Sequence, residues 1–165
     1  MLNVHKWTDV PSRLRQSYGV ALQTILSRLS SAAPRSEMKS EEGVSRLANV
    51  HALIAEDDAL IALDIEHTLA SHFGLRLSVV HGLNEAVRLA SGDRPDIAIL
   101  DLVLRGESVE PLARLLAADG VPILFVSGYR SHPLEHLADG LMLEKPYSSE
   151  KLIEFVGLAL GRLAR

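Results

Sequence analysis

Short apolar runs alternate with longer amphipathic stretches from residue 51 to the end of the chain. A run of branched apolar residues is typical of a buried strand, whereas apolar residues three and four positions apart give a helix one buried stripe. The pattern predicts strands over residues 52–55, 76–80, 96–100, 122–126 and 141–143. It predicts helices over residues 59–73, 84–90, 109–118 and 149–163. Strands that alternate with helices predict an α/β fold, in which helices cover both faces of a parallel sheet.

Residues 1–48 follow another pattern, and we assign the α/β domain to residues 49–165. Apolar side chains recur at steps of three and four between residues 11 and 31, at Leu14, Tyr18, Leu22, Ile25 and Leu29. This spacing predicts one amphipathic N-terminal helix, followed by a linker rich in Ser, Glu and Lys. Three interpretations stay open. The helix packs on the main domain or frays, it forms a dimer or binds a partner, or Met38 is the true first residue.

The composition narrows the class of protein. The 165 residues include no cysteine, which excludes thiol catalysis and a disulfide framework. The apolar runs are too short to span a membrane and the N-terminus lacks a secretory signal, so we expect a cytoplasmic protein. Residues 1–48 carry seven Lys/Arg and four Asp/Glu, whereas residues 49–165 carry ten and seventeen. An acidic main domain argues against nucleic-acid binding.

Polar side chains follow the predicted strands at the point where each strand ends. Glu56 and Asp57 follow the first strand, Asp101 the third, Ser127 the fourth and Lys145 the fifth. Adjacent parallel strands lie about 5 Å apart, so these side chains should converge on one pocket at the carboxyl edge of the sheet. Converging carboxylates repel unless a cation is present, and Mg²⁺ prefers oxygen ligands. With an ammonium and a hydroxyl nearby, the set predicts a site where a phosphoryl group is placed on a carboxylate.

Four motifs in this order, "LIAEDD", "ILDLVL", "FVSGY" and "LEKPY", resemble the receiver domain of bacterial two-component response regulators. The resemblance covers about residues 50–163. It implies a flavodoxin-like, doubly wound five-stranded sheet in the order 2-1-3-4-5. It also implies that Asp101 is the phosphoacceptor and that a histidine kinase or histidine phosphotransfer protein donates the phosphoryl group.

The same resemblance assigns roles to the other pocket residues. It implies that Glu56 and Asp57 are the acidic pair that holds Mg²⁺, with Asp57 the more direct ligand. The backbone carbonyl of Val103 matches a further metal ligand. Ser127 matches the switch hydroxyl, and Lys145 matches the invariant lysine, whose peptide bond to the following proline is expected to be cis.

Two positions depart from the common receiver pattern. Met142 stands three residues before Lys145, where receivers usually carry a switch aromatic. The fourth-strand motif resembles that of stand-alone receivers with a Phe-x-Thr-Gly-aromatic signature, with serine in place of threonine. We therefore hypothesise that Tyr129 is the switch aromatic and that Gly128 lets the loop rearrange.

Simpler interpretations exist for several of these residues. Asp101 alone could be a helix cap or a solvated strand-end acid, Lys145 a surface lysine and Ser127 a turn residue. Asp58 is expected to cap the following helix rather than to bind metal. The histidines at positions 132 and 136 are four apart, but the proline between them argues against a helical metal site.

Three functions compete on the sequence alone. The first is a phosphorylation-dependent protein–protein switch or phosphoryl relay without its own DNA-binding output domain. The second is a pseudo-receiver scaffold that binds partners without phosphoryl transfer. The third is an aspartyl-phosphate hydrolase, which often carries a second aspartate two positions after the nucleophile. That position is Val103 here, so the sequence favours the first.

Overall fold

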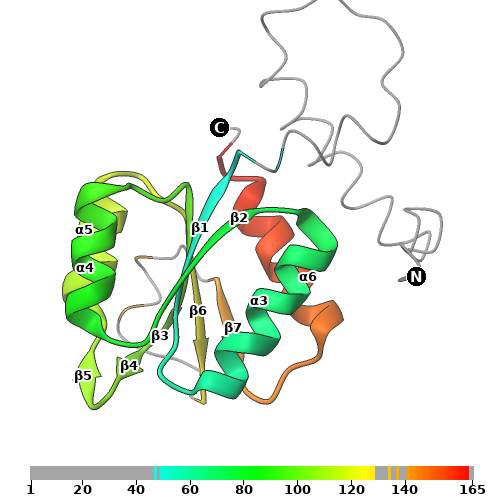
Figure 1. Cartoon of the computed structure of the whole chain (residues 1–165), viewed down its shortest axis with the longest axis horizontal. Coiled ribbons are helices and arrows are strands. Elements are labelled where there is room, and N and C mark those ends of the chain that lie inside the picture. The colour runs from blue at the N-terminus through cyan, green and yellow to red at the C-terminus, as the bar shows by residue number, and fades with distance from the viewer. Residues whose placement is uncertain (1–46, 48, 129–133, 135–136, 138–140, 164–165) are drawn as a thin grey trace, which may run out of the picture.

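The computed structural model describes residue 47, residues 49–128, residues 134 and 137, and residues 141–163. The predicted N-terminal helix, Tyr129 and the histidines at 132 and 136 lie outside the described residues. Five parallel strands form one sheet in the order β2-β1-β3-β6-β7 (Figure 1). They are β1 (His51–Ala55), β2 (Arg76–Val80), β3 (Ile97–Asp101), β6 (Ile123–Ser127) and β7 (Met142–Glu144).

Four described helices cover the two faces of this sheet. They are α3 (Ala59–Phe73), α4 (Leu83–Gly92), α5 (Glu110–Ala118) and α6 (Ser149–Leu160). Helices α3 and α6 lie together on one face, and α4 and α5 lie together on the other (Figure 1). The predicted fold class and strand order are confirmed, because the five sheet strands follow the order 2-1-3-4-5 along the chain.

The core explains why the central strands are almost wholly apolar. All residues of β1 and β6, and the first four of β3, are buried, since each strand has helices on both sides. Each helix contributes one apolar stripe to this core, as the sequence period predicts. The buried stripe includes Ile65 and Leu69 of α3, Leu112 and Leu116 of α5, and Leu152 and Val156 of α6.

Helix α3 starts where the sequence predicts. The Asp58 side chain accepts hydrogen bonds from the backbone N–H groups of Leu60 and Ile61, at 2.9 and 3.3 Å. Asp58 is therefore an N-cap, as predicted, and its carboxylate satisfies donors that the first helical turn leaves without partners. At the other end Gly74 takes the left-handed conformation with a φ of 64° and closes the helix.

Some predicted boundaries were wrong by one residue or more. Strands β3, β6 and β7 each begin and end one residue later than predicted, and α6 ends at Leu160 rather than at residue 163. As a result Asp101 and Ser127 are the last residues of their strands rather than the residues that follow them. They stay in the sheet because the ladder continues, with Asp101 beside Val126 and Ser127 beside Glu144.

A small antiparallel hairpin was not predicted. It consists of β4 (Val103–Leu104) and β5 (Glu107–Ser108) and lies directly after β3. Strands of two residues are too short for an alternating pattern to identify them. No helix in the described part of the chain is both long enough and apolar enough to cross a membrane.

Candidate functional site

Three carboxylates meet at the carboxyl edge of the sheet. Glu56, Asp57 and Asp101 each offer an oxygen, and these oxygens all lie within 4.8 Å of one another. The register explains the convergence: Ala55 of β1 lies beside Leu100 of β3, so the residues that follow are neighbours. A set of carboxylate oxygens suits a hard divalent cation such as Mg²⁺. The cluster is therefore a candidate metal site.

Lys145 links two of these acids. Its Nζ donates hydrogen bonds to Glu56 Oε2 at 2.6 Å and to Asp101 Oδ2 at 2.7 Å. Burial alone would lower the pKa of Lys145, but hydrogen bonds to the Asp101 and Glu56 carboxylates outweigh it and raise that pKa. The ammonium group therefore keeps its charge and offsets that of two anions. The Lys145–Pro146 peptide bond is cis, as the resemblance implied.

Glu56 is the most buried acid of the cluster, with 1% of its surface exposed. Burial raises its pKa, although the hydrogen bond from Lys145 acts in the opposite direction. A cation bound here would favour the ionised carboxylate. The site thus gathers three carboxylates whose ionised forms a bound cation would stabilise.

Ser127 ends β6 beside this cluster. It is buried, and its backbone carbonyl accepts a hydrogen bond from the Lys145 N–H at 2.7 Å. The preceding residue, Val126, lies opposite Asp101 in the sheet. The register therefore places Ser127 at the same edge as Asp101 and Lys145.

The pairing pattern of the β4–β5 hairpin turns the backbone of Val103 toward the acids. In an antiparallel pair, hydrogen-bonded residue pairs alternate with pairs that are not bonded to each other. The Val109 N–H donates to the Leu102 carbonyl at 3.0 Å, so the next pair, Val103 with Ser108, is of the non-bonded kind. Val103 thus points its N–H and C=O away from β5, and its N–H lies 3.4 Å from Asp101 Oδ1.

The sequence analysis missed two further contacts at the site. His81, which follows β2, places Nδ1 2.8 Å from the backbone carbonyl oxygen of Glu56. The Arg105 N–H donates to Asp57 Oδ2 at 2.9 Å. The position of His81 at the end of a strand beside β1 was the clue available for it. No comparable clue existed for a backbone amide of the hairpin.

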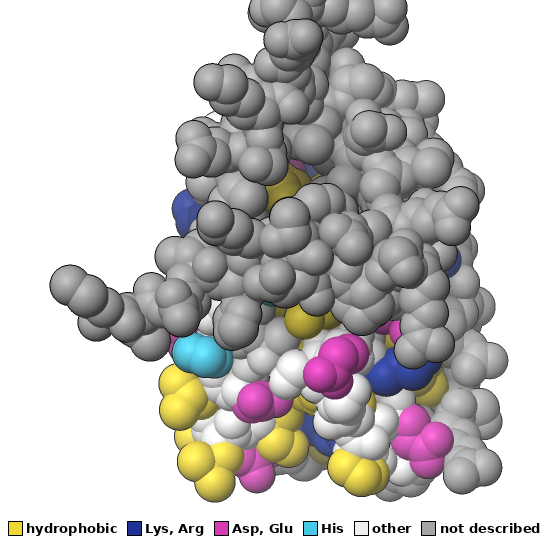
Figure 2. Space-filling model, turned by 90° about the vertical axis from the view of Figure 1, so that its right-hand side faces the viewer, with side chains coloured by type: hydrophobic (Ala, Val, Ile, Leu, Met, Phe, Trp, Pro, Cys, Tyr) yellow, Lys and Arg dark blue, Asp and Glu magenta, His cyan; other side chains and the backbone are white. Residues whose placement is uncertain are grey.

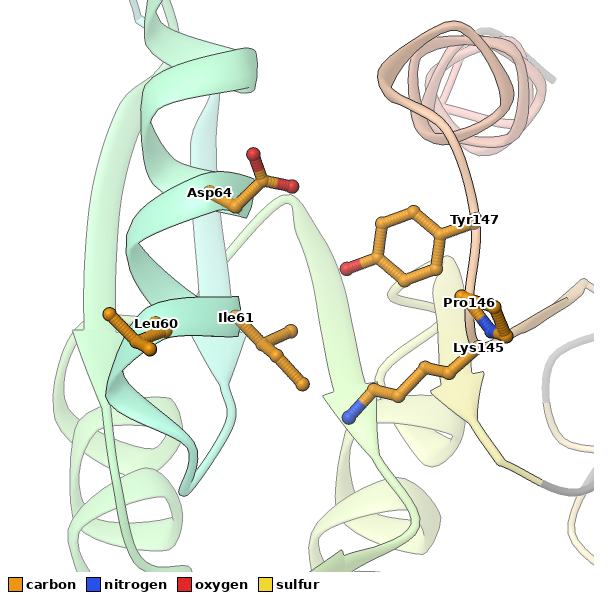
Figure 3. Close-up of a pocket in the computed structure, with 6 residues that line it drawn as sticks. All are labelled: Leu60, Ile61, Asp64, Lys145, Pro146 and Tyr147. Carbon is orange, nitrogen blue, oxygen red and sulfur yellow. The ribbon is translucent and has the colours of Figure 1, made fainter.

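A pocket of about 440 Å³ adjoins the acids and shares Lys145 with them (Figure 3). Its lining residues are Leu60, Ile61, Asp64, Lys145, Pro146 and Tyr147. Figure 3 shows the Tyr147 side chain reaching from the segment after β7 toward α3. Its hydroxyl is buried and has no hydrogen-bond partner among the residues that the structure describes. On the face that α3 and α6 form, hydrophobic and acidic side chains lie next to each other (Figure 2).

Not every singled-out residue belongs to this cluster. The Asp58 carboxylate faces the start of α3 and caps it. Met142 is half-buried in β7, beside Phe125 of β6.

Comparison with known proteins agrees with the fold. No protein-family model matches the chain. The transcriptional regulatory protein PdtaR of Mycobacterium tuberculosis H37Rv is 31% identical over 115 residues, which make up 67% of this chain and 56% of PdtaR. The chain therefore spans little more than half the length of this curated relative.

Two solved structures match at similar identity over nearly their whole length. The signal receiver domain of a modulated diguanylate cyclase from Desulfovibrio desulfuricans G20 is 31% identical, covers 70% of this chain and 96% of its own, and has a TM-score of 0.58. A response regulator receiver protein from Sinorhizobium medicae WSM419 is 30% identical, covers 69% and 96%, and has a TM-score of 0.58.

A doubly wound parallel sheet with acids and a lysine at its carboxyl edge defines a receiver-type signalling domain. The chain belongs to the receiver-domain family of response regulators, the proteins of two-component signalling.

Proposed function

We propose that this chain is a response-regulator receiver that accepts a phosphoryl group on Asp101 from a histidine kinase or a histidine phosphotransfer protein. It then acts as a phosphorylation-dependent protein–protein switch or as a phosphoryl relay. One observation carries the proposal: Asp101 Oδ2 lies 2.7 Å from Lys145 Nζ while Glu56 and Asp57 supply carboxylate oxygens within 4.8 Å. An acceptor oxygen thus lies between an ammonium group and a candidate metal site.

The chemistry is an exchange of one phosphorus bond for another. An Asp101 carboxylate oxygen attacks phosphorus and forms a P–O bond, while the P–N bond to the donor imidazole breaks. The imidazole keeps the electron pair of that bond and takes up a proton. Hydrolysis later joins a water oxygen to phosphorus, breaks the P–O bond to Asp101 and releases inorganic phosphate. Apart from this transfer and its slow hydrolysis, we propose no enzymatic turnover.

Each pocket residue has a role in this proposal. Glu56, Asp57, Asp101 and the Val103 carbonyl would hold Mg²⁺, which neutralises phosphoryl oxygens when bound. Lys145 supplies the second positive charge at those oxygens. Ser127 donates a hydrogen bond to the phosphorylated carboxylate, and Tyr129 is the aromatic whose position reports it.

The surroundings of Asp101 suit a protein donor. Leu60 of α3 is 78% exposed and Val103 of β4 is 41% exposed, so apolar side chains project from the elements around the acids. Burying such side chains against a partner stabilises a complex by roughly 25 cal/mol per Å² of apolar surface. We propose that the donor docks here with its histidine directed at Asp101.

Three further proposals concern the division of the chain, its location and its output. We propose that residues 1–48 are a separate segment and residues 49–165 the receiver. The predicted amphipathic helix of that segment packs on the receiver or frays, forms a dimer, or binds a partner. We propose a cytoplasmic location and an output that involves no nucleic acid contact by the receiver.

A pseudo-receiver scaffold is the alternative, and one experiment separates the two. The full chain is incubated with a small acyl phosphate in Mg²⁺ or in EDTA, and its intact mass is followed over time. We expect a gain of one phosphoryl group that needs Mg²⁺, disappears in Asp101→Asn and persists in the control Asp119→Asn, an exposed acid at the end of α5. No gain with any donor would favour the scaffold, and rapid repeated turnover of the donor would favour a hydrolase.

A further inference from the structure

Arg105 has a backbone conformation that residues with a Cβ rarely adopt. Its φ is 51°, and among the described residues it is the one non-glycine residue with a positive φ. The left-handed region is disfavoured for L residues and persists where the surrounding structure requires it. Arg105 lies between β4 and β5, directly beside the acid cluster.

The hairpin requires this conformation. Arg105 and Gly106 form the two-residue connection between the strands, and Gly106 also has a positive φ, of 84°. Two successive positive φ values define the turn whose twist matches that of the flanking strands. Leu104, which precedes the turn, is completely buried, as is Val109 on the other side of the hairpin. The core therefore fixes where the turn lies.

The turn leaves the Arg105 amide outside the hairpin ladder. In a two-residue hairpin the flanking residues, here Leu104 and Glu107, pair with each other. The N–H of Arg105 therefore points outside the ladder, where it meets Asp57 Oδ2 at 2.9 Å, across 48 residues of sequence. A hydrogen bond to a carboxylate is stronger than one between neutral groups. Because a carboxylate has two oxygens, a bond to one orients the other.

We infer that the β4–β5 hairpin is a positioning device for the cation site. Its turn holds the Asp57 carboxylate through the Arg105 N–H, and its first strand directs the Val103 backbone toward the same cluster. Arg105 is thus a positioning residue that acts through its main chain. The cation part of this inference rests on the proposed function. If the hairpin orients Asp57, then cation binding and hairpin order stabilise each other by the same factor.

Two glycines provide a matched test of the cation part. Gly106 and Gly120 have φ values of 84° and 72°, and a Cβ added at either position would meet nothing within 4 Å. Alanine at either position therefore strains the backbone without a clash. Only Gly106 lies in the hairpin, whereas Gly120 precedes β6 at the amino end of the strands.

The measurement is the Mg²⁺ dissociation constant of the full chain by calorimetry, together with the melting temperature in EDTA. We expect both Gly106→Ala and Gly120→Ala to lower the melting temperature. Only Gly106→Ala should weaken Mg²⁺ binding, by about tenfold, the size of effect expected when a hydrogen bond to a charged group is lost. Equal Mg²⁺ affinity in the two variants would overturn the inference. The proposal that Asp101 is phosphorylated would still stand.

A second readout needs no metal. Hydrogen exchange of the Arg105 amide is followed by NMR in the metal-free wild type and in Asp57→Ala, with the Leu100 amide of β3 as internal reference. We expect exchange at Arg105 to become about tenfold faster relative to Leu100. Unchanged exchange would show that Asp57 does not hold the turn. A wild-type chain that binds no Mg²⁺ would overturn the proposed function as well as the cation part of this inference.

Discussion

The Lys145 ammonium group lies 2.7 Å from Asp101 Oδ2, and the same nitrogen bonds to Glu56 at 2.6 Å. The Lys145 side chain is only 18% exposed and that of Glu56 only 2%. Lys145 therefore offsets one of the two negative charges of Glu56 and Asp101, in a setting that screens charge poorly. Its removal should affect both the fold and the phosphoryl site.

Replacing Lys145 with methionine should destabilise the domain. The variant leaves the buried Glu56 charge without its partner, and breaking a buried ion pair costs about 3 kcal/mol of unfolding free energy. Urea unfolding in EDTA measures this loss. The matched control is Lys151→Met, because Lys151 pairs with Glu154 on the exposed face of α6. An equal effect in both variants would contradict the importance of the buried pair.

Replacing the neighbouring acids Asp57 and Asp58 with asparagine should affect the stabilisation by Mg²⁺ differently. At a Mg²⁺ concentration of 100 times the dissociation constant, binding should stabilise the wild type by about 2.7 kcal/mol. We expect Asp57→Asn to lose most of this gain. Asp58→Asn should keep it, because asparagine is an equally good helix N-cap. Thermal unfolding with and without Mg²⁺ distinguishes the two, and loss of the gain in Asp58→Asn would refute its assignment as a cap.

His51 should make the stability of the domain fall in mild acid. Its ring is buried at the amino edge of the sheet, with Nε2 2.8 Å from Ser78 Oγ. Burial, followed by the positive charge of Arg76, lowers its pKa despite the opposing carboxylates of Asp93 and Asp96. The unfolded chain therefore binds a proton more readily than the folded chain, and stability present at neutral pH is lost as the pH falls below about 6.5.

The measurement compares urea unfolding of the wild type and of His51→Gln between pH 8 and pH 5. The difference between the unfolding free energies of the two proteins should change by at most about 1.4 kcal/mol per pH unit, the limit for one proton. An identical pH dependence would show that His51 does not contribute.

Removing the Tyr147 hydroxyl should not harm the fold. The hydroxyl is buried and has no partner within the described part of the chain, and burial followed by the charge of Glu56 raises the pKa of Tyr147. Because a buried polar group without a partner is unfavourable, Tyr147→Phe should stabilise the domain by up to about 1 kcal/mol. Thermal unfolding checks this. A loss of stability would mean that the hydroxyl makes a favourable interaction in solution.

The residues that the sequence predicted best are polar side chains that interrupt apolar runs. Glu56, Asp57, Asp101 and Lys145 each follow a run of strand residues, and the topology of a parallel sheet brings such positions together. The change from apolar to polar residues also led to a predicted end of β3 at residue 100, one residue too early. Asp101 is polar but still belongs to the strand, because pairing depends on the backbone rather than on the side chain.

What the sequence could not predict depends on the backbone. The Arg105 N–H that bonds to Asp57 has no side-chain signature, and the partners are 48 residues apart. The ring contact of His81 depends on how β2 lies beside β1. Such contacts follow from the folded arrangement, so they become visible only once strand order and register are known.

The position of the phosphoryl group tests the central claim most directly. The full chain is reacted with a small acyl phosphate in Mg²⁺. Borohydride then reduces the aspartyl phosphate formed on the protein to an alcohol, and peptide mass spectrometry identifies the modified residue. We predict modification at Asp101 alone, and none in Lys145→Met at the same reaction time. Modification at Glu56 or Asp57, or no modification of the wild type, would contradict the account.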